Sequence, residues 1–574
     1  MFFASEKKAP CWAWQCLALV FTGIILLIFP RVFLENDDLG FIYLLSHGFY
    51  APWVSKPFCW LLIHLYAALP DVAWYGILQY LILALLLGLL LKLTDDWAVD
   101  QQRSPIVRRW LTGAILLLFY PFILRITFTC VSILSGGIGI LLLLASFRQG
   151  QPSGPKSRYL WSVFGFGSVF ALCYFVRPEG IGAMIFLLPA MLYAAYGARQ
   201  WILSRQGALI GLVFLIPFLG SLILDNHLMR YPTNQVPYLT YVVSSNNVFG
   251  FGSTEQFKNH PEWLRPLGWS RNDYTMLERF LYWDESVFSQ DKINQLAHRT
   301  PEAAVGRLKN LLNPGILFAR LYKTLIKTWL SNYTFTLYCV GLLILFSWMG
   351  TSRLSRVFPP LFLGFVFTGS MLMQYVMRFP YRVACPTIIL VTLSLLAMPG
   401  FEVNRLYNAP GKLKRASALL LTFCALWLFI FNGPVRIVRT ALLPLSQTRT
   451  KLDALNRLMV DHYLLREAAV IPISASDPLN PTPLKAPDIG PGWLIQSPPY
   501  YQRLHAFGLP NGAALIPASV NNSKILYFFK DKDLPSLETF IAQHYRQTVR
   551  FTPVEHLLPA TVSHKSHLYQ LRSQ

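Results

Sequence analysis

The sequence predicts a polytopic α-helical membrane protein with about 11 transmembrane helices and a C-terminal extracytoplasmic α/β domain. Three observations predict this class. Of the 574 residues, 54% are hydrophobic and only 14% are charged, and the mean hydropathy is +0.41, which is typical of chains that cross a bilayer many times. Apolar stretches recur at the length of one span. The stretches are joined by connections, and every second connection along the chain is rich in basic residues.

Each predicted span is an apolar stretch of roughly 20 residues, although several are shorter. The first follows Lys7 and Lys8 and has no small-residue cleavage site after it, so it indicates an uncleaved signal anchor with a cytoplasmic N-terminus. The predicted spans are 12–30, 72–91, 111–126, 130–147, 159–176, 180–197, 207–224, 333–349, 357–376, 383–398 and 416–432.

Every second connection is basic, which places those connections in the cytoplasm. The alternate connections then lie outside, and among them are the long loops 31–71 and 225–332 and the region 433–574. The net charge of +22 therefore reflects topology and contact with anionic membrane lipids, and we exclude nucleic acid as a partner. The basic connections contain Lys92, Arg103, Arg108, Arg109, Arg148, Lys156, Arg158, Arg199, Arg205, Arg353, Arg356, Arg405, Lys412, Lys414 and Arg415.

The composition divides the chain into a transmembrane module, 1–432, and a soluble periplasmic α/β domain, 433–574. Prolines concentrated between 472 and 499 mark a loop-rich section of that domain. Around it the pattern predicts helices at 449–468 and 534–546 and strands at 513–520 and 524–530. Within the module it predicts a short interfacial helix at about 57–70 and a basic amphipathic helix near 317–329. The eight cysteines have no metal-binding spacing.

Three carboxylates follow the first span directly, at Glu35, Asp37 and Asp38. Acids so close together repel one another, and the pKa of at least one should rise. A carboxylate of raised pKa can act as a general base toward a hydroxyl. The competing interpretation is an acidic turn that only ends the helix. His47 and His64 lie nearby, but a lone histidine is more often structural, and we assign neither to the site.

Arginines occupy the short turns on the same predicted face, where positive charge is normally scarce. Guanidinium groups at a water–lipid boundary suit a phosphate or pyrophosphate through bidentate hydrogen bonds. The competing interpretation is that they snorkel from span ends or, for Arg177, pair with Glu179. The second outside loop adds the acid Asp273 and, near its end, the base Lys323. The arginines are Arg125, Arg177, Arg378 and Arg382.

Several features together resemble the GT-C superfamily of integral membrane glycosyltransferases. They are the first span, the segment Glu35-Asn36-Asp37-Asp38, the interfacial helix, the second long outside loop, the turns Arg177-Pro178-Glu179 and Arg378-Phe379-Pro380-Tyr381-Arg382, and the C-terminal extracytoplasmic domain. The resemblance covers 1–432 by architecture and does not specify a member, a sugar or an acceptor.

The resemblance implies an enzyme of the bacterial inner membrane that takes a sugar from a polyprenyl-phosphate donor and transfers it, with inversion, to a glycan, lipid or protein acceptor. Its base would be an acidic residue of the first loop, so Asp37 and Asp38 are the catalytic candidates. The substrate-binding candidates are Arg125, Arg177, Glu179, Asp273, Lys323, Arg378 and Arg382. No cofactor is required, although the paired acids could hold a divalent metal.

Three other functions remain open at this point. An O-antigen polymerase or ligase would also use a lipid-linked sugar, but would depend more on arginines and a histidine in large outside loops. A lipid-linked sugar flippase would need a polar central cavity, and the predicted span interiors contain no ionisable residue. A non-catalytic scaffold for the C-terminal domain predicts that the outer charges do not converge in space.

Overall fold

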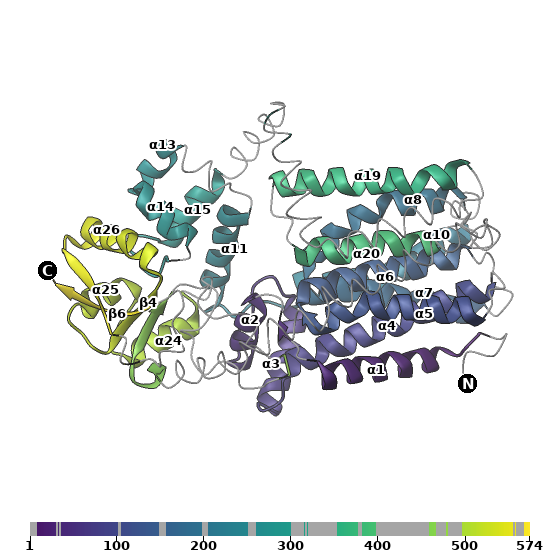
Figure 1. Cartoon of the computed structure of the whole chain (residues 1–574), viewed down its shortest axis with the longest axis horizontal. Helices are drawn as coiled ribbons and strands as arrows, with labels where there is room; N and C mark the ends of the chain where they lie inside the picture. The colour runs from purple at the N-terminus through teal and green to yellow at the C-terminus, as the bar shows by residue number, and fades with distance from the viewer. Residues whose placement is uncertain are drawn as a thin grey trace.

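The protein is described by a computed structural model that places residues 8–29, 32–33, 36–100, 105–148, 156–197, 205–250, 260–279, 281–299, 315, 318, 353–376, 381–397, 458–466, 478–479, 496–554, 557 and 567–573. Long helices lie side by side as a bundle, and the short helices α2 (Asn36–Ser46) and α3 (Lys56–Ala68) lie at one end of it (Figure 1). The C-terminal strands lie beyond that end, whereas the N-terminus lies at the opposite end.

The bundle helices reproduce the apolar stretches of the sequence. Each predicted span within the described residues lies mostly on a helix, although 111–126 ends in the strand residues Arg125 and Ile126. Five described helices are long and apolar enough to cross a membrane. Spans 333–349 and 416–432 lie outside the described residues, so the total of about 11 stays a prediction. The bundle comprises α1 (Cys11–Ile28), α4 (Trp74–Asp100), α5 (Pro105–Leu124), α6 (Phe128–Arg148), α7 (Lys156–Val176), α8 (Leu188–Gly197), α10 (Arg205–Ile223), α19 (Arg353–Val376) and α20 (Tyr381–Ala397).

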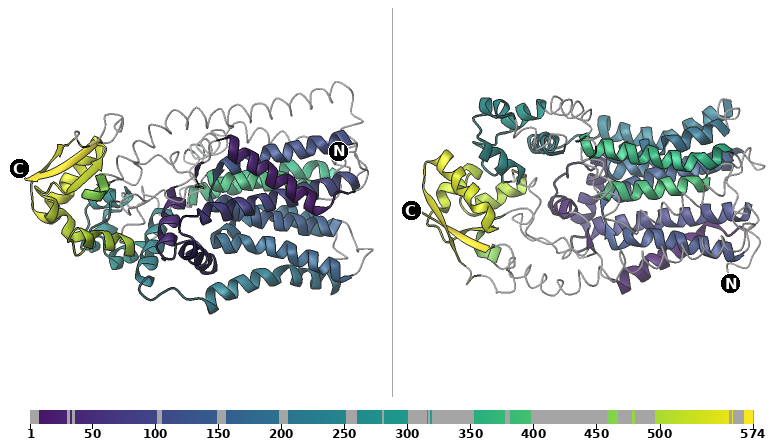
Figure 2. Two further views of the ribbon diagram at one scale, coloured as in Figure 1. Left: turned by 90° about the horizontal axis from the view of Figure 1, so that it is seen from below. Right: turned by 45° about the horizontal axis from the view of Figure 1, so that its top comes forward.

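Helix α6 is the centre of the bundle. In its most apolar window 94% of the residues are buried, against 17% for residues 205–228 at the periphery. It packs against α4, α7 and α20, and Figure 2 shows the bundle helices side by side from two further directions. Glycines permit the closest approaches, because a side chain at Gly139 would collide with the Phe170 backbone of α7.

The predicted span 180–197 is not one continuous α-helix. Residues Pro178–Leu187 form the 3-10 helix η2, and α8 continues from Leu188. The backbone at Gly180 lies directly against the Ser132 side chain of α6, where a Cβ atom would collide. We attribute the irregular start to Pro178 and to this close contact.

Several connections between bundle helices contain short elements. Two-residue strands β1 (Val32–Phe33) and β2 (Arg125–Ile126) pair in parallel. Helix α3 begins where the Ser55 hydroxyl accepts a hydrogen bond from the Phe58 amide at 3.4 Å, with Pro57 in its first turn. The helix predicted at about 57–70 is therefore present. After α10 come the π-helical turn η3 (Leu224–Leu228) and α11 (Val236–Gly250).

The C-terminal region forms a four-stranded mixed sheet in the order β3-β4-β6-β5. Strand β3 runs parallel to β4, and β6 runs antiparallel to both β4 and β5. Helix α26 contacts β5. The elements are β3 (Tyr463–Arg466), α24 (Pro498–Ala506), η8 (Gly512–Ala514), α25 (Leu515–Ser519), β4 (Ile525–Phe529), η9 (Asp531–Asp533), α26 (Leu534–Tyr545), β5 (Val549–Pro553) and β6 (His567–Ser573).

Two of the four elements predicted here are confirmed and two need correction. The strand at 524–530 and the helix at 534–546 are present as β4 and α26. The strand predicted at 513–520 is wrong, because η8 and α25 occupy it, and Pro517 would have removed a sheet donor there. The helix predicted at 449–468 is wrong at its end, because Tyr463–Arg466 pair with β4 as a strand.

This sheet shares its hydrophobic core with part of the second outside loop. The loop contributes α13 (Pro261–Leu264), η4 (Arg265–Leu267), α14 (Arg271–Glu278) and α15 (Gln290–His298). Fully buried Trp283 and Phe288 of the loop pack against Phe540 of α26. We call this combined structure, formed by the described residues of 260–299, 458–466 and 496–573, the C-terminal unit. The domain boundary at 433 stays a prediction.

Candidate functional site

The candidate site lies at the end of the bundle that carries α2 and α3 (Figure 1). Five chain segments meet there: the first turns of α2, α4 and α20, the β2–α6 turn, and the turn after α7. The pairing of Val32 with Arg125 joins the first outside loop to the turn between α5 and α6. This pairing places the Arg125 backbone beside the segment that leads to the acids Asp37 and Asp38.

Asp38 is fully buried, with 0% of its surface exposed. Its Oδ1 accepts a hydrogen bond from the Tyr75 hydroxyl at 2.8 Å and another from the Phe128 amide at 3.2 Å. Burial raises the pKa of Asp38 to about 7, even though hydrogen bonds from Tyr75, Phe128 and Thr127 act in the opposite direction. Asp38 thus ties α2 to α4 and to the start of α6.

Asp37, by contrast, reaches the surface, with 23% of its side chain exposed. Its Oδ2 lies 3.3 Å from Nη1 of Arg382, which is 19% exposed. The Arg382 carbonyl accepts a hydrogen bond from the Cys130 thiol at 3.2 Å, which joins the first turn of α20 to α6. The carboxylate and the guanidinium are therefore held by separate helices and can both face one ligand.

Arg177 supplies a second guanidinium. It lies over the Phe128 ring, 4.7 Å from the ring centroid, and donates to the Thr129 hydroxyl at 2.5 Å. Its Nε is 3.4 Å from the carboxylate of Glu179. Burial lowers the pKa of Arg177, Glu179 raises it and Arg382 lowers it again. Arg177 contacts Phe128 and Thr129, and the Arg382 carbonyl contacts Cys130, so both arginines border the first turn of α6. An anion at this turn would be stabilised by guanidinium groups.

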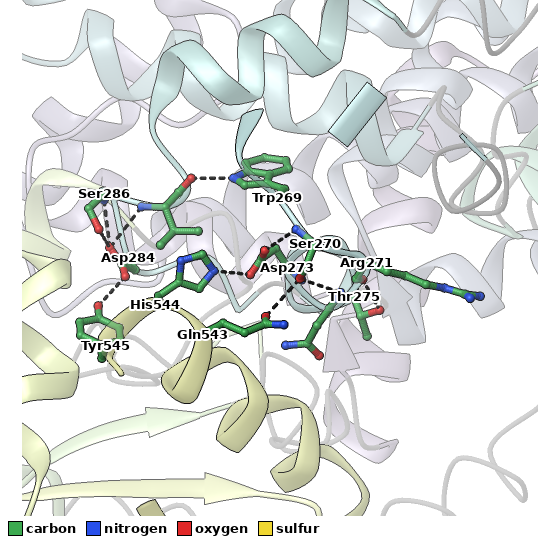
Figure 3. A network of polar contacts seen from close by, with 12 residues as sticks. Trp269, Ser270, Arg271, Asp273, Thr275, Asp284, Ser286, Gln543, His544 and Tyr545 are labelled. Carbon is green, nitrogen blue, oxygen red and sulfur yellow. Dashed lines mark hydrogen bonds and ion pairs between the residues drawn. The ribbon is translucent and has the colours of Figure 1, made fainter. Parts of the chain in front are cut away.

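Among the other predicted site residues, Asp273 is not part of this group. Asp273 lies in the C-terminal unit, where it completes a capping box with Ser270 at the start of α14. Its Oδ1 is 2.7 Å from Nε2 of His544 in α26, as Figure 3 shows. Lys323 and Arg378 lie outside the described residues.

A second polar cluster, which the sequence analysis did not identify, lies near Glu179. Asp225 in η3 accepts a hydrogen bond from the Lys56 amide at 2.8 Å and one from the Tyr174 hydroxyl, also at 2.8 Å. The Lys56 ammonium is 4.0 Å from the same carboxylate and lies over the Tyr231 ring. This cluster could have been identified from the sequence, because Asp225 is an acid at the very end of an apolar run.

Within the described ranges, no three His, Cys, Asp or Glu side chains are grouped closely enough to hold a metal ion. Asp37 and Asp38 point into different surroundings, one exposed and one buried.

The fold and the site define a helical protein with several helices of membrane-spanning length and, at one end of the bundle, an acid and two arginines in one charged group. Comparison with known proteins adds a structural likeness. ArnT from Cupriavidus metallidurans bound to undecaprenyl phosphate is 10% identical, with 97% of each chain covered and a TM-score of 0.33. The same protein in the apo state has a TM-score of 0.34 at the same identity and coverage. No protein-family model and no curated protein matches the sequence. Likeness at these TM-scores assigns no family, so the proposal below rests on the residues.

Proposed function

We propose that this protein is a membrane glycosyltransferase that moves a sugar from a polyprenyl-phosphate donor to a glycan, lipid or protein acceptor. The observation that carries the proposal is the pairing of Asp37 with Arg382 at 3.3 Å, with Arg177 against the same first turn of α6 that the Arg382 backbone contacts. At the end of an apolar bundle, a carboxylate can accept the proton of an acceptor hydroxyl. Two guanidinium groups beside it can bind the phosphate of a lipid donor.

We assign the base to Asp37 because Asp38 has no exposed surface with which to touch an acceptor. Asp37 takes the proton of the acceptor hydroxyl as its oxygen bonds to the anomeric carbon. The bond from that carbon to the phosphate oxygen breaks, and its electron pair leaves with the polyprenyl phosphate. Attack from the face opposite the leaving group inverts the anomeric centre.

Arg382 and Arg177 stabilise the charge that grows on the departing phosphate. Arg125 and Glu179 border the site, and Lys323 and Arg378 remain phosphate-binding candidates. Asp38 has a positioning role, since its hydrogen bonds join α2, α4 and α6. The reaction takes place on the outer face of the bacterial inner membrane, with the N-terminus in the cytoplasm and the C-terminal unit in the periplasm.

The competing functions are less well supported by this arrangement. A scaffold does not require outer charges to converge, and those of Asp37 and Arg382 do. A flippase requires lipid binding without proton transfer, and an O-antigen polymerase or ligase would not need an acidic base after the first span. These alternatives are separated by assaying transfer from a synthetic polyprenyl-phosphate sugar and lipid binding in parallel.

The test compares Asp37→Asn with Arg382→Lys in the purified full-length chain. Asp37→Asn retains shape but cannot take a proton, so the transfer rate should fall by roughly 10²–10⁴ while lipid binding persists. Arg382→Lys retains the charge but loses the planar, bidentate donor, so donor use should weaken as well.

Asp38→Asn is the matched variant and should lose less activity than Asp37→Asn. If both asparagine variants retain full turnover, the acidic pair only ends a helix and the assignment is wrong. Lipid binding that persists in every variant, with no transfer even by the parent, would instead identify a flippase. Mass spectrometry of envelope glycans with and without the protein would name the sugar and the acceptor.

A further inference from the structure

A segment of the C-terminal region contacts the bundle at the first turn of α4, which is one of the segments that form the candidate site. Pro478 is buried, and its carbonyl lies so close to Gly76 in the first turn of α4 that any Cβ atom there would collide with it. The next residue, Leu479, is half-buried and packs against the hydrophobic core of the bundle. Glycine at position 76 is thus what allows these two backbones to meet.

The residue before Gly76 is Tyr75, which supports the acidic pair. Its side chain is fully buried and its hydroxyl donates to Asp38 at 2.8 Å. Its amide donates to the Tyr66 hydroxyl of α3 at 3.2 Å. The first turn of α4 is therefore held by Asp38 and Tyr66, and by the Pro478 backbone against Gly76.

We propose that Gly76 and Pro478 are positioning residues for the proposed transfer reaction, acting through Tyr75 and Asp38 on the base Asp37. This inference rests on the proposed function. Asp37 and Asp38 are neighbours in the first turn of α2, so a displacement of Tyr75 is transmitted to Asp37 through one hydrogen bond and one peptide unit. Small displacements of a base relative to its substrate cost large factors in rate.

The arrangement gives the C-terminal region a part in catalysis that does not require it to touch substrate. The Pro478 carbonyl contacts the first turn of α4 at Gly76, and the Tyr75 side chain of the same turn donates a hydrogen bond to Oδ1 of the buried Asp38. Without the Tyr75 hydroxyl, Asp38 would lose a hydrogen-bond donor in a site from which water is excluded. The contact therefore does more than add packing area.

The experiment is a double-mutant cycle in the full-length protein, assayed with a synthetic polyprenyl-phosphate sugar. Gly76→Ala displaces Pro478, and Tyr75→Phe removes the hydroxyl that reaches Asp38. Each should lower kcat on the order of tenfold while KM for the donor stays within about twofold. If Gly76 acts through Tyr75, the double variant should be no slower than the slower single variant.

The control is Gly113→Ala in α5, where a Cβ atom meets nothing within 4 Å, and this variant should retain the kcat of the parent. If Gly76→Ala does not fold, Leu479→Ala takes its place in the cycle. Its loss of kcat should likewise be non-additive with that of Tyr75→Phe. Fully additive losses, or a Gly76→Ala protein with the turnover of the parent, would overturn the proposal.

A second readout does not depend on activity. Hydrogen exchange of the amides at 36–46 and 74–80 should become faster in Gly76→Ala and Leu479→Ala, but not in Gly113→Ala. Unchanged exchange would overturn the inference whatever the activity. Faster exchange in a protein whose parent transfers no sugar would instead contradict the proposed function and leave the mechanical coupling standing.

Discussion

At the scale of single residues, the adjacent aspartates Asp37 and Asp38 lie in different surroundings. Asp37 is partly exposed against a guanidinium, and Asp38 is buried against a tyrosine hydroxyl and an amide. Burial penalises the charged form, which is why the pKa of Asp38 rises to about 7. The charge of Asp38 therefore opposes folding at the pH where the residue ionises.

Asp38→Asn tests this assignment through pH-dependent stability. In the parent the unfolded chain ionises Asp38 near its ordinary pKa of ~3.9, whereas the folded chain retains the proton up to about 7. The stability that Asp38 provides is thus fully present below the ordinary pKa and is lost as pH rises toward 7, at ~1.4 kcal/mol per pKa unit as an upper limit.

Asparagine cannot ionise, so the apparent Tm of the variant minus that of the parent should grow between those pH values and level off above them. The other carboxylates contribute equally to both proteins and cancel in the difference. The measurement is thermal unfolding of detergent-purified protein across pH 4 to 8 at fixed ionic strength, an interval chosen to span the titration. A difference that is constant with pH would show that Asp38 ionises normally.

At the scale of elements, the packing of α6, α7 and α10 depends on glycines placed at helix crossings. A Cβ atom at Gly167 of α7 would collide with the Phe214 backbone of α10, and the Phe170 ring of α7 packs nearby against the rings of Phe214 and Phe218 of α10. In apolar surroundings helices associate by close packing rather than by removal of surface from water. The crossing therefore depends on the absence of a side chain.

Gly167→Ala should accordingly destabilise the protein by about 1–3 kcal/mol, the usual cost of overpacking. Gly165→Ala, two residues away on the same helix, is the matched control, because a Cβ atom there meets nothing within 4 Å. It should be neutral or slightly stabilising, since alanine favours the helix over glycine. Comparing the apparent Tm of the two variants measures the effect, and equal values would mean that α7 and α10 do not pack at this crossing.

At the scale of the whole molecule, the C-terminal unit is assembled from two distant parts of the chain. Polar contacts join its two parts. His544 lies 2.7 Å from Asp273 and Tyr545 donates a hydrogen bond to Asp284 (Figure 3). Arg279 lies 2.6 Å from Asp533. The shared core is a stronger constraint than these polar contacts, because it includes the fully buried Trp283.

Trp283→Ala should therefore disturb the C-terminal sheet even though Trp283 belongs to the second outside loop. Deleting a buried tryptophan costs about 3–5 kcal/mol, and the amides of α26 and β4 should exchange faster in the full-length variant. Trp161→Ala, at a side chain that is 72% exposed on α7, is the control and should change neither. Unchanged exchange in α26 and β4 would show that the region after 433 folds independently of the loop.

The sequence by itself determined the helical elements of the bundle and the identity of the residues that converge at its end. Hydropathy is a local property that each apolar stretch carries in its own residues, so the helices on those stretches could be predicted. The acids after the first span and the arginines of the outer turns were identified because charge is conspicuous at the ends of apolar runs.

Only the tertiary structure decided what these residues contact. The difference between Asp37 and Asp38, the support of Tyr75 by Pro478, and the Asp225 cluster all depend on contacts between residues far apart in the chain. The strand at Tyr463–Arg466 and the core shared with 260–299 arise in the same way, since strand pairing and burial are set by the partner rather than by local propensity. Burial and hydrogen-bond partners are non-local quantities, and they determine which carboxylate can meet a substrate.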